Sequence, residues 1–428
     1  MRARPDIVIG GGLGGLTCAL LLARAGREVV VFEKAGAVGG RASTHEEAGA
    51  LLNLGPHALY CEGAARTLLR ELGVDPAGAR PPMSGALARD GGRLHALPVG
   101  FTSILSTSLL GLGEKLEAAR LLQSLPRIDW RALRGRSVGE WIEGAARGDG
   151  TRRLLHALVR LTTYASAPDL LAADEAARQL ALGVSSGVMY VHGGWQTIAR
   201  ELARLAAGAG AAIHVSSRVA AVAPGRVTLA DGSELPAASV FIAGGPAVAA
   251  ELVPSSAALA AARSAAVPVH AACLDLALTG LPRPRAAFCL GVDEPLYYSV
   301  HTATAELARG GVQVIHAARY LAPGERADAS SLELMLDQLQ PGWRERVVAR
   351  RFLPRLVVAN DLHAVGRRRP GPAVPDAPGV FAVGDWVGDG AMLADAVLAS
   401  AKAAVALALD ADRRAEAMPA SRAAVAGL

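Results

Sequence analysis

The first 33 residues place a β-branched strand, a glycine-rich turn, an apolar helix and a second strand in close succession. A strand expected over residues 6–9 runs directly into Gly10-x-Gly12-x-x-Gly15, and the second strand ends at Glu33. Gly10 permits a tight turn, Gly12 lets the backbone approach a pyrophosphate, and Gly15 lets the helix pack closely on the strand. A glycine-rich turn in an ordinary α/β domain is the plain alternative. The spacing of strand, helix and acid instead predicts a Rossmann-type parallel sheet that binds a dinucleotide.

The helix after this turn is expected from about Leu16 to Ala25, with its N-terminus, Leu13 and Gly14 beside it, at the expected pyrophosphate. Its free N–H groups and the positive end of its dipole favour an anion there. Glu33 lies 18 residues beyond Gly15, where a carboxylate accepts hydrogen bonds from ribose hydroxyls. Because that carboxylate would repel a 2′-phosphate, we expect a dinucleotide other than NADP.

A second glycine motif follows Glu33. Lys34 begins a stretch that ends in Gly39-Gly40-Arg41. With the fingerprint before it, this stretch resembles the flavin amine-oxidase superfamily, which includes phytoene-desaturase-like and protoporphyrinogen-oxidase-like enzymes. The resemblance implies that the two glycines and Arg41 wrap the pyrophosphate of FAD, and a guanidinium group suits phosphate oxygens.

The C-terminal part resembles the same superfamily. A short strand over 380–383 meets Gly384-Asp385, and an alanine-rich helix is expected over 391–409. The resemblance implies that Asp385 binds the ribityl chain. It also implies that the helix N-terminus, at Ala391 and Met392, is directed at the flavin N1–C2=O edge, where its positive dipole would stabilise the anionic reduced flavin.

We expect the FAD to be noncovalent, because no cysteine follows Cys289 and the C-terminal thioether link of some amine oxidases cannot form. The resemblance further implies that the turn at Gly55 passes close to the flavin ring and that the strand at Val219 contacts adenine. The residues assigned to FAD are therefore Gly10, Gly12, Leu13, Gly14, Gly15, Glu33, Lys34, Gly39, Gly40, Arg41, Gly55, Pro56, His57, Val219, Gly384, Asp385, Ala391 and Met392.

The resemblance covers essentially the whole chain and implies two interleaved domains. The expected fold class is α/β, with a Rossmann-type FAD-binding domain interleaved with an α+β substrate domain, as in amine oxidases and GDP-dissociation inhibitors. The expected FAD-binding segments are 1–75, 186–255 and 351–428. The expected substrate-domain segments are 76–185, which is mainly helical, and 256–350.

Composition limits the partners and the cellular setting. The net charge is +5, but acids and bases are interspersed without a basic stripe, so we expect no nucleic acid partner. The four cysteines lack metal-ligand spacing and favour a reduced setting without a metal. No apolar run reaches the roughly 18 to 20 residues of a membrane span. The fingerprint begins within ten residues of Met1, which leaves no room for a signal peptide, so we expect a cytoplasmic protein.

The expected chemistry depends on what the chain lacks. Many amine oxidases hold a water near flavin N5 with a mid-chain lysine, but no lysine stands between Lys115 and Lys402, and aromatic residues make up only 4% of the chain. No second nucleotide fingerprint occurs, so oxygen or a quinone is the expected electron acceptor. These features favour desaturation of a small hydrophobic, isoprenoid-like molecule by hydride transfer to flavin N5. The alternatives are an amine oxidase, a protoporphyrinogen-oxidase-like enzyme, and a non-catalytic prenyl- or lipid-binding protein like the GDP-dissociation inhibitors.

Few polar side chains are candidates for the substrate pocket. His57 stands beside the glycine expected at the flavin, and its imidazole could act as a general acid or base. Each candidate taken singly also fits a hydrogen-bonded structural role. Two expected strands carry the others on alternating positions: Tyr190 and His192 on the first, and Tyr297, Ser299 and His301 on the second.

The segment 101–125 is amphipathic, with leucines opposite charged residues such as Glu114 and Arg120. A helix packed on the core is the favoured interpretation. The alternative is an interfacial helix through which the protein contacts a membrane peripherally.

Overall fold

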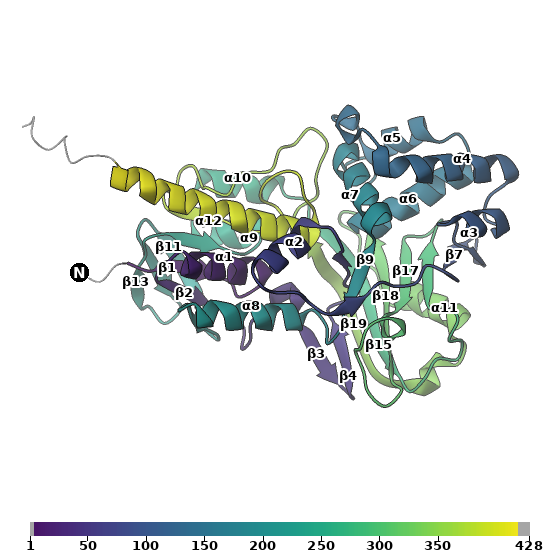
Figure 1. The fold of residues 1–428 in the computed structure, drawn as a ribbon, viewed down its shortest axis with the longest axis horizontal. Helices are drawn as coiled ribbons and strands as arrows, with labels where there is room; N and C mark the ends of the chain where they lie inside the picture. The colour runs from purple at the N-terminus through teal and green to yellow at the C-terminus, as the bar shows by residue number, and fades with distance from the viewer. Residues whose placement is uncertain (1–3, 418–428) are drawn as a thin grey trace, which may run out of the picture.

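The computed structural model describes residues 4–417, which form two parts lying side by side (Figure 1). One part is built on a five-stranded parallel sheet and the other on a seven-stranded, mostly antiparallel sheet. The chain crosses between the two parts several times. This arrangement confirms the predicted fold class, a Rossmann-type domain interleaved with an α+β domain.

The parallel sheet has the fingerprint strand at its centre. Apolar residues fill both faces of this strand and its neighbours, as expected where helices connect parallel strands. Ile7 and Ile9 face one apolar cluster, whereas Val8 faces the other. The strand order is β10 (Ala212–His214), β2 (Val29–Phe32), β1 (Asp6–Ile9), β14 (Val240–Ile242) and β20 (Val380–Ala382).

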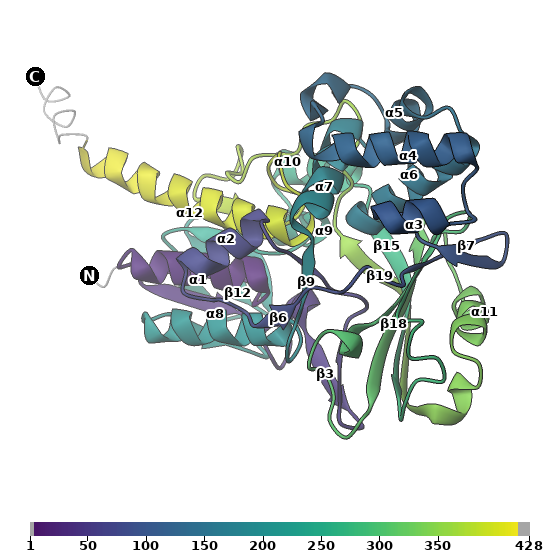
Figure 2. The ribbon, with the colours of Figure 1, turned by 45° about the vertical axis from the view of Figure 1, so that its right-hand side comes forward.

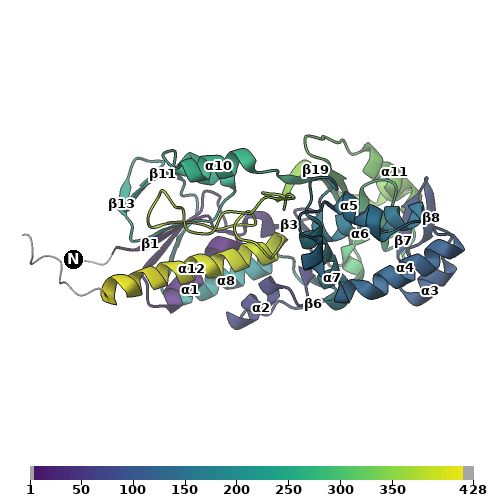
Figure 3. The ribbon, with the colours of Figure 1, turned by 90° about the horizontal axis from the view of Figure 1, so that it is seen from above.

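Different layers cover the two faces of the parallel sheet. On one face, α1 (Leu13–Arg24) packs between α8 (Gln196–Gly208) and α12 (Leu393–Ala417), and α12 also contacts α2 (Ala64–Glu71). Figure 3 shows α12 running along this part of the molecule. The other face is covered by a small antiparallel sheet and two helices: β11 (Val219–Ala223), β12 (Arg226–Leu229), β13 (Glu234–Pro236), α9 (Pro246–Leu252) and α10 (Ala257–Ala265).

The seven-stranded sheet forms the core of the second part. Neighbouring strands are antiparallel except β16 and β7, which are parallel. The order is β19 (Val347–Ala359), β15 (Val269–Leu278), β18 (Gln313–Leu321), β17 (Leu296–Val300), β16 (Phe288–Gly291), β7 (Leu87–Asp90) and β8 (Arg93–Ala96).

Helices flank the seven-stranded sheet on two sides (Figure 2). The helix α11 (Ser330–Leu339) packs on one face, against Leu274 and Leu276 of β15 and their neighbours. A helical layer packs at one end of the sheet and consists of α3 (Phe101–Ser106), α4 (Leu112–Ser124), α5 (Val138–Ala145), α6 (Asp149–Thr163) and α7 (Ala173–Ser186).

Two small antiparallel sheets lie between the main parts. They contain β3 (Thr44–Glu47) with β4 (Ala50–Asn53), and β9 (Val188–Val191) between β5 (Leu59–Tyr60) and β6 (Gly78–Ala79). Short 3₁₀ turns complete the described elements: η1 (Gly40–Ala42), η2 (Leu125–Arg127), η3 (Trp130–Leu133), η4 (His301–Ala303) and η5 (Trp343–Arg346).

The structure corrects one predicted domain boundary. A boundary at residue 350 would cut β19, which runs to Ala359 within the seven-stranded sheet. Residues 351–359 therefore belong with the substrate segment. The error arose because three arginines (Arg350, Arg351 and Arg355) and Pro354 interrupt β19, so it lacks the continuous apolar run that marks a buried strand.

The amphipathic segment divides between core and surface. Ile104, Leu109, Leu110 and Leu125 are buried, and Leu121 and Leu122 pack against the same core. Three leucines instead face outward: Leu105, Leu112 and Leu116 are 60, 87 and 54% exposed. Within residues 4–417, no helix is both long enough and apolar enough to cross a bilayer.

Candidate functional site

A cavity of about 480 Å³ is lined by residues from both parts of the molecule. The glycine turn after β1 and the start of α12 lie on one side of it, and the residues of β15 and β19 lie on the other. The predicted FAD residues that line it are Gly10, Gly12, Leu13, Gly14, Glu33, Lys34, Gly39, Gly40, Arg41, Pro56, His57 and Gly384. The cavity thus brings together motifs from the two ends of the sequence.

A glycine is needed at each of the three fingerprint positions for a different structural reason. Gly10 has φ +106°, and a Cβ there would lie 2.6 Å from the carbonyl oxygen of Ala243. A Cβ on Gly15 would lie 1.9 Å from the carbonyl oxygen of Gly10, so this glycine permits the contact between α1 and β1. A Cβ on Gly12 would meet only the Gly39 carbonyl, at 3.9 Å. Gly12 is therefore required by what enters the cavity rather than by the fold.

Glu33 is fixed at the end of β2 by backbone donors. Its two carboxylate oxygens accept hydrogen bonds from the N–H groups of Gly11 and Ala35, each at 2.7 Å. The side chain is buried but still lines the cavity. Each oxygen retains acceptor capacity, so the carboxylate fits the ribose hydroxyls that the sequence predicts for it.

Arg41 forms an ion pair with Asp385, and this pairing was not predicted from the sequence. The guanidinium Nη1 lies 2.5 Å from Asp385 Oδ2 and donates to the Val358 carbonyl at 2.8 Å. Asn360 Nδ2 donates to the other Asp385 oxygen at 2.8 Å. Burial raises the pKa of this carboxyl, but Arg41 and Asn360 outweigh that effect and hold the pKa below its ordinary value. Asp385 is therefore ionised and is not itself part of the cavity lining, whereas Arg41 is.

The C-terminal helix meets the cavity two residues later than predicted. The lining contains Leu393, Ala394, Asp395 and Val397, and not Ala391 or Met392. The helix spans Leu393–Ala417, and its first residue, Leu393, has φ +55°, outside the right-handed helical region. In the preceding loop the Ala391 carbonyl accepts a hydrogen bond from His363, and Met392 is buried in the core of the helical layer.

Asp395 is a site residue that the sequence interpretation missed. Its Oδ1 accepts a hydrogen bond from the N–H of Ala65 at 2.7 Å, in the first turn of α2. A Cβ on Gly63 would lie 2.5 Å from both carboxylate oxygens, so the carboxylate takes the place of a capping side chain. Burial raises the pKa of Asp395 to about 6. The sequence did contain a signal for this residue: Asp395 is an acid in the first turn of the C-terminal helix, which was expected to lie at the flavin.

His57 is partly buried and lies between two carbonyl groups. Its Nδ1 lies 3.1 Å from the Gly55 carbonyl and its Nε2 lies 3.1 Å from the Arg41 carbonyl. Burial lowers its pKa to about 4, although the two carbonyls act in the opposite direction. The ring is therefore neutral near pH 7 and carries one N–H, which donates to one of the two carbonyls. His57 thus lies between the Gly55 turn, whose Gly55 has φ +73°, and Arg41, and both ring nitrogens face the protein backbone.

The end of the cavity beside this turn is apolar. Ala271 and Cys273 of β15 and Leu356 of β19 form one wall. Tyr60 and Tyr164 contribute aromatic rings, and the Tyr164 hydroxyl donates to the Pro56 carbonyl at 3.1 Å. Tyr164 has φ +60°, an uncommon conformation for a bulky residue and one that concentrates at functional sites.

The predicted substrate residues do not line this cavity. Tyr190, Tyr297, Ser299 and His301 come together in a buried cluster: the two tyrosine hydroxyls are 3.1 Å apart, Tyr297 donates to Ser299 at 2.8 Å, and His301 stacks on Tyr190 at 3.9 Å. His192 lies apart and accepts a hydrogen bond from the Glu306 N–H. Alternation correctly placed Tyr297 and Ser299 on one face of a strand but could not show how deeply that face is buried.

Three residues assigned to FAD also lie outside the lining. Gly15 is packed against Gly10, Gly55 is covered by Cys273 and Leu356, and Val219 is buried in the cluster under the small sheet. These three residues pack behind the cavity wall and do not face the cavity.

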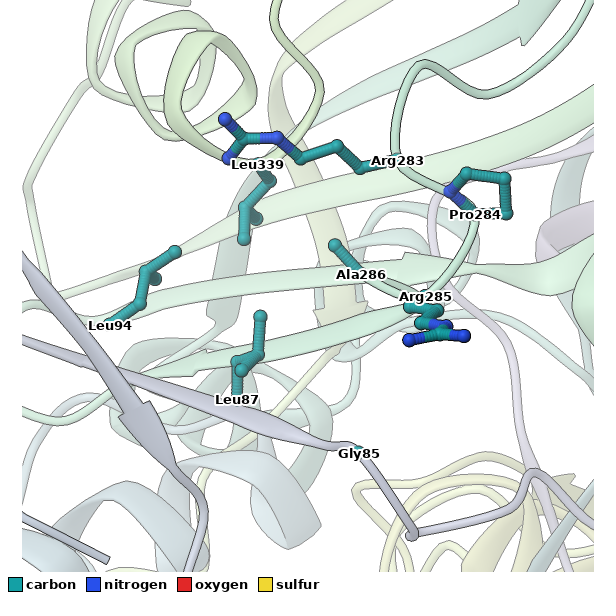
Figure 4. Close-up of a pocket in the computed structure, with 8 residues that line it drawn as sticks. All are labelled: Gly85, Leu87, Leu94, Arg283, Pro284, Arg285, Ala286 and Leu339. Carbon is teal, nitrogen blue, oxygen red and sulfur yellow. The ribbon is translucent and has the colours of Figure 1, made fainter.

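A second cavity, of about 620 Å³, shares no residue with the first (Figure 4). Leu87, Leu94 and Leu339 form its apolar floor, and Arg283 and Arg285 stand at its edge. The Arg283 guanidinium is already used, since it donates to the Gln338 carbonyl. No buried acid, base or nucleophile lines this cavity, so it offers no chemistry of its own.

Comparison with known proteins identifies the family. The sequence model described as flavin containing amine oxidoreductase matches residues 13–275. A putative flavin-containing monoamine oxidase of Mycobacterium tuberculosis is 29% identical over 216 residues, which are 46% of this chain and 47% of that protein. A phytoene desaturase of Neurospora crassa is 41% identical over 74 residues, 17% of this chain and 12% of that protein. The chain thus matches about half the length of the first relative and a small part of the second.

Solved structures support the fold over nearly the whole chain. An oxidoreductase from Methanosarcina mazei superposes with a TM-score of 0.75 at 21% identity and covers 95% of this chain and 100% of its own. Cyclohexylamine oxidase from Brevibacterium oxydans gives a TM-score of 0.68 at 17% identity, with 96 and 100% coverage. The flavin family and the fit of the cavity together identify the cofactor as FAD. Gly12 leaves room for a pyrophosphate, Glu33 suits a ribose, and Arg41 adds a cation.

Proposed function

The chain belongs to the flavin-containing amine oxidoreductase family, and on that premise we propose that it dehydrogenates a neutral hydrophobic molecule with FAD as the oxidant. The observation that carries this proposal is the apolar wall of Ala271, Cys273 and Leu356 beside the Gly55 turn. This wall presents no carboxylate that would pair with a cationic amine, and the chain supplies no lysine there. An isoprenoid-like substrate suits such a surface.

The residues of the chain bind, orient and exclude water in this proposal. Bound FAD would supply the hydride acceptor. The apolar wall and the rings of Tyr60 and Tyr164 would hold the substrate by burial of its hydrocarbon surface, which contributes about 25 cal/mol per Å². Both ring nitrogens of His57 face backbone carbonyls at 3.1 Å, so we assign this side chain a structural role in the proposal. Asp395, buried in the lining with its pKa raised to about 6, is the side chain suited to exchange a proton near neutral pH.

An amine oxidase is the alternative within the family. The relative from Mycobacterium tuberculosis bears that name, and an uncharged amine could enter an apolar pocket. A protoporphyrinogen-oxidase-like activity is a third possibility. A non-catalytic lipid-binding protein would not need the cradle formed by Gly12, Glu33 and Arg41, which is present in full.

Anaerobic reduction of the purified holoprotein tests the proposal. Protein carrying FAD is mixed with isoprenoid hydrocarbons in detergent, and in parallel with primary amines, and loss of the flavin band near 450 nm is followed. Bleaching by the hydrocarbons, with a desaturated product by mass spectrometry, supports desaturation. Bleaching by the amines alone would replace it with the amine oxidase. Admission of oxygen or a soluble quinone to the reduced enzyme then identifies the electron acceptor.

We also propose that Leu105, Leu112 and Leu116 place the protein on a membrane surface from which a hydrophobic substrate enters. The three side chains are exposed on neighbouring helices, α3 and α4, where water is an unfavourable neighbour. In a co-sedimentation assay, the wild type should sediment with phosphatidylcholine vesicles. The variant with all three leucines changed to Gln should stay in the supernatant. Equal sedimentation of both proteins would exclude this contact.

A further inference from the structure

A row of polar side chains crosses the seven-stranded sheet at one level. Asp275 of β15 stands directly opposite His316 of β18 on one side and Arg351 of β19 on the other. Asp275 and His316 are completely buried. Ala271 and Cys273, four and two positions before Asp275, share its face of β15 and line the flavin cavity. The row therefore continues the substrate wall on the side nearest the Gly55 turn.

This row binds the backbone of that turn. Asp275 Oδ2 accepts a hydrogen bond from the Gly55 N–H at 3.3 Å, and Arg351 donates to the Asn53 carbonyl. Asp275 is itself held by Arg351 at 2.7 Å and by His316 Nδ1 at 2.6 Å. The turn is also held from the helical layer, where the Tyr164 hydroxyl donates to the Pro56 carbonyl.

The contacts form one path between the two parts of the molecule. Asp275 meets Gly55, His57 lies between the carbonyls of Gly55 and Arg41, and Arg41 pairs with Asp385, which follows β20. The path thus runs from the substrate wall, through the turn beside the flavin, to the FAD-binding part. Cys273 closes the space between wall and turn, because a Cβ on Gly55 would lie 2.9 Å from its Sγ.

Burying this carboxylate is expensive for stability alone. Apolar residues of similar volume stabilise a core at least as well as a buried ion pair does, whereas directional bonds to a backbone segment fix one arrangement of the chain. We propose that Asp275 is a positioning residue, which holds the Asn53–His57 turn at a fixed distance from β15 and so sets the gap in which flavin and substrate meet. Arg351 and His316 keep Asp275 ionised and oriented for this task. The proposal rests on the binding of FAD and on the function proposed above.

Flavin spectroscopy tests the proposal without any substrate. Asp275→Asn keeps the shape of the side chain but removes its charge, and Tyr164→Phe removes only the bond to Pro56. The control is Asp6→Asn, since Asp6 is equally buried and pairs with Arg27 at 3.0 Å, away from the cavity lining. For each protein we would measure the FAD dissociation constant, the visible spectrum, the flavin midpoint potential and the unfolding temperature of the apoprotein.

We expect Asp275→Asn to raise the FAD dissociation constant at least tenfold and to shift the flavin spectrum and potential. Tyr164→Phe should act in the same direction but less, and Asp6→Asn should change only the unfolding temperature. A merely structural Asp275 would lower the unfolding temperature and leave all three flavin readouts within twofold of wild type, which would overturn the proposal. Should Asp275→Asn not fold, Arg351→Lys, which keeps the charge but shortens the reach to Asn53, serves with Tyr164→Phe.

The failure of this inference differs from failure of the proposed function. A wild type that binds FAD but oxidises no hydrophobic compound contradicts the proposed substrate and leaves the flavin readouts valid. Unchanged flavin readouts in Asp275→Asn, beside a wild type that desaturates its substrate, contradict only the positioning role.

Discussion

The FAD cradle and the substrate wall are built by different rules. The cradle is backbone chemistry: Gly10 and Gly15 are required by a tight turn and a close approach, and Gly12 between them leaves its backbone open to the cavity. The wall is assembled from β15 and β19, whose facing residues are about 80 positions apart in the sequence. Local sequence therefore specifies where the cofactor lies, whereas strand register specifies what faces it. Substitutions in the cradle should therefore change FAD binding, and substitutions in the wall should change substrate turnover.

The largest expected effect comes from two alanine substitutions in the cradle. Gly15→Ala forces a Cβ within 1.9 Å of a backbone oxygen and should destabilise the apoprotein by about 3 kcal/mol or more. Gly12→Ala meets no close neighbour, so the apoprotein should keep its stability and lose FAD affinity. Urea unfolding and FAD titration distinguish the two.

A matched control for these substitutions is Gly113→Ala in α4. No atom lies within 4 Å of its added Cβ, and alanine favours a helix over glycine by about 1 kcal/mol. Equal unfolding curves for Gly12→Ala and Gly15→Ala would contradict the assignment of one glycine to the cofactor and the other to the fold.

The next largest effect should follow the loss of Arg41. Arg41→Met removes the cation that faces the cavity and leaves the Asp385 carboxylate without its partner, so we expect the FAD dissociation constant to rise about tenfold or more. We expect FAD to dissociate on gel filtration. Arg27→Met is the control, because it removes the arginine of the Asp6 pair and should lower stability while FAD stays bound.

The wall should respond in the opposite manner. Ala271→Leu adds three carbons to the apolar surface beside the turn and should lower kcat/KM for a hydrophobic substrate about tenfold. The FAD dissociation constant should stay within twofold of wild type. Loss of FAD binding together with turnover would show that wall and cradle are not separable in this way.

This contrast explains which of the residues predicted from the sequence line the cavity. Gly12, Glu33 and Gly39-Gly40-Arg41 were predicted because each acts through the backbone beside it or through a fixed spacing. Tyr297 and Ser299 were placed on the correct side of their strand but assigned to the wrong environment, because alternation does not reveal what packs on a face. Asp275, His316 and Arg351 could not be predicted as a group. Their meeting depends on the pairing of three strands, which no local pattern in the sequence encodes.

The smallest expected effect is the pH-dependent change in stability on substitution of Asp395, which lines the cavity at the start of α12. Its pKa rises from 3.8 to about 6 on folding, so its contribution to stability is fully present below pH 3.8 and is lost as the pH rises through 6. The shift corresponds to at most about 3 kcal/mol, and we expect about 1 kcal/mol after solvent relaxation. Asp395→Asn keeps the acceptor for Ala65 and cannot ionise.

The variant should therefore match wild type near pH 4 and gain about 1 kcal/mol over it by pH 7, in urea unfolding of the apoproteins. His57 has the opposite dependence, because burial lowers its pKa from 6.5 to about 4 and its contribution grows as the pH rises through that range. Since both proteins contain His57, its contribution cancels in their difference. A difference that stays constant from pH 4 to 7 would mean that Asp395 remains ionised in the folded protein, and the proton exchange suggested for it would lose its basis.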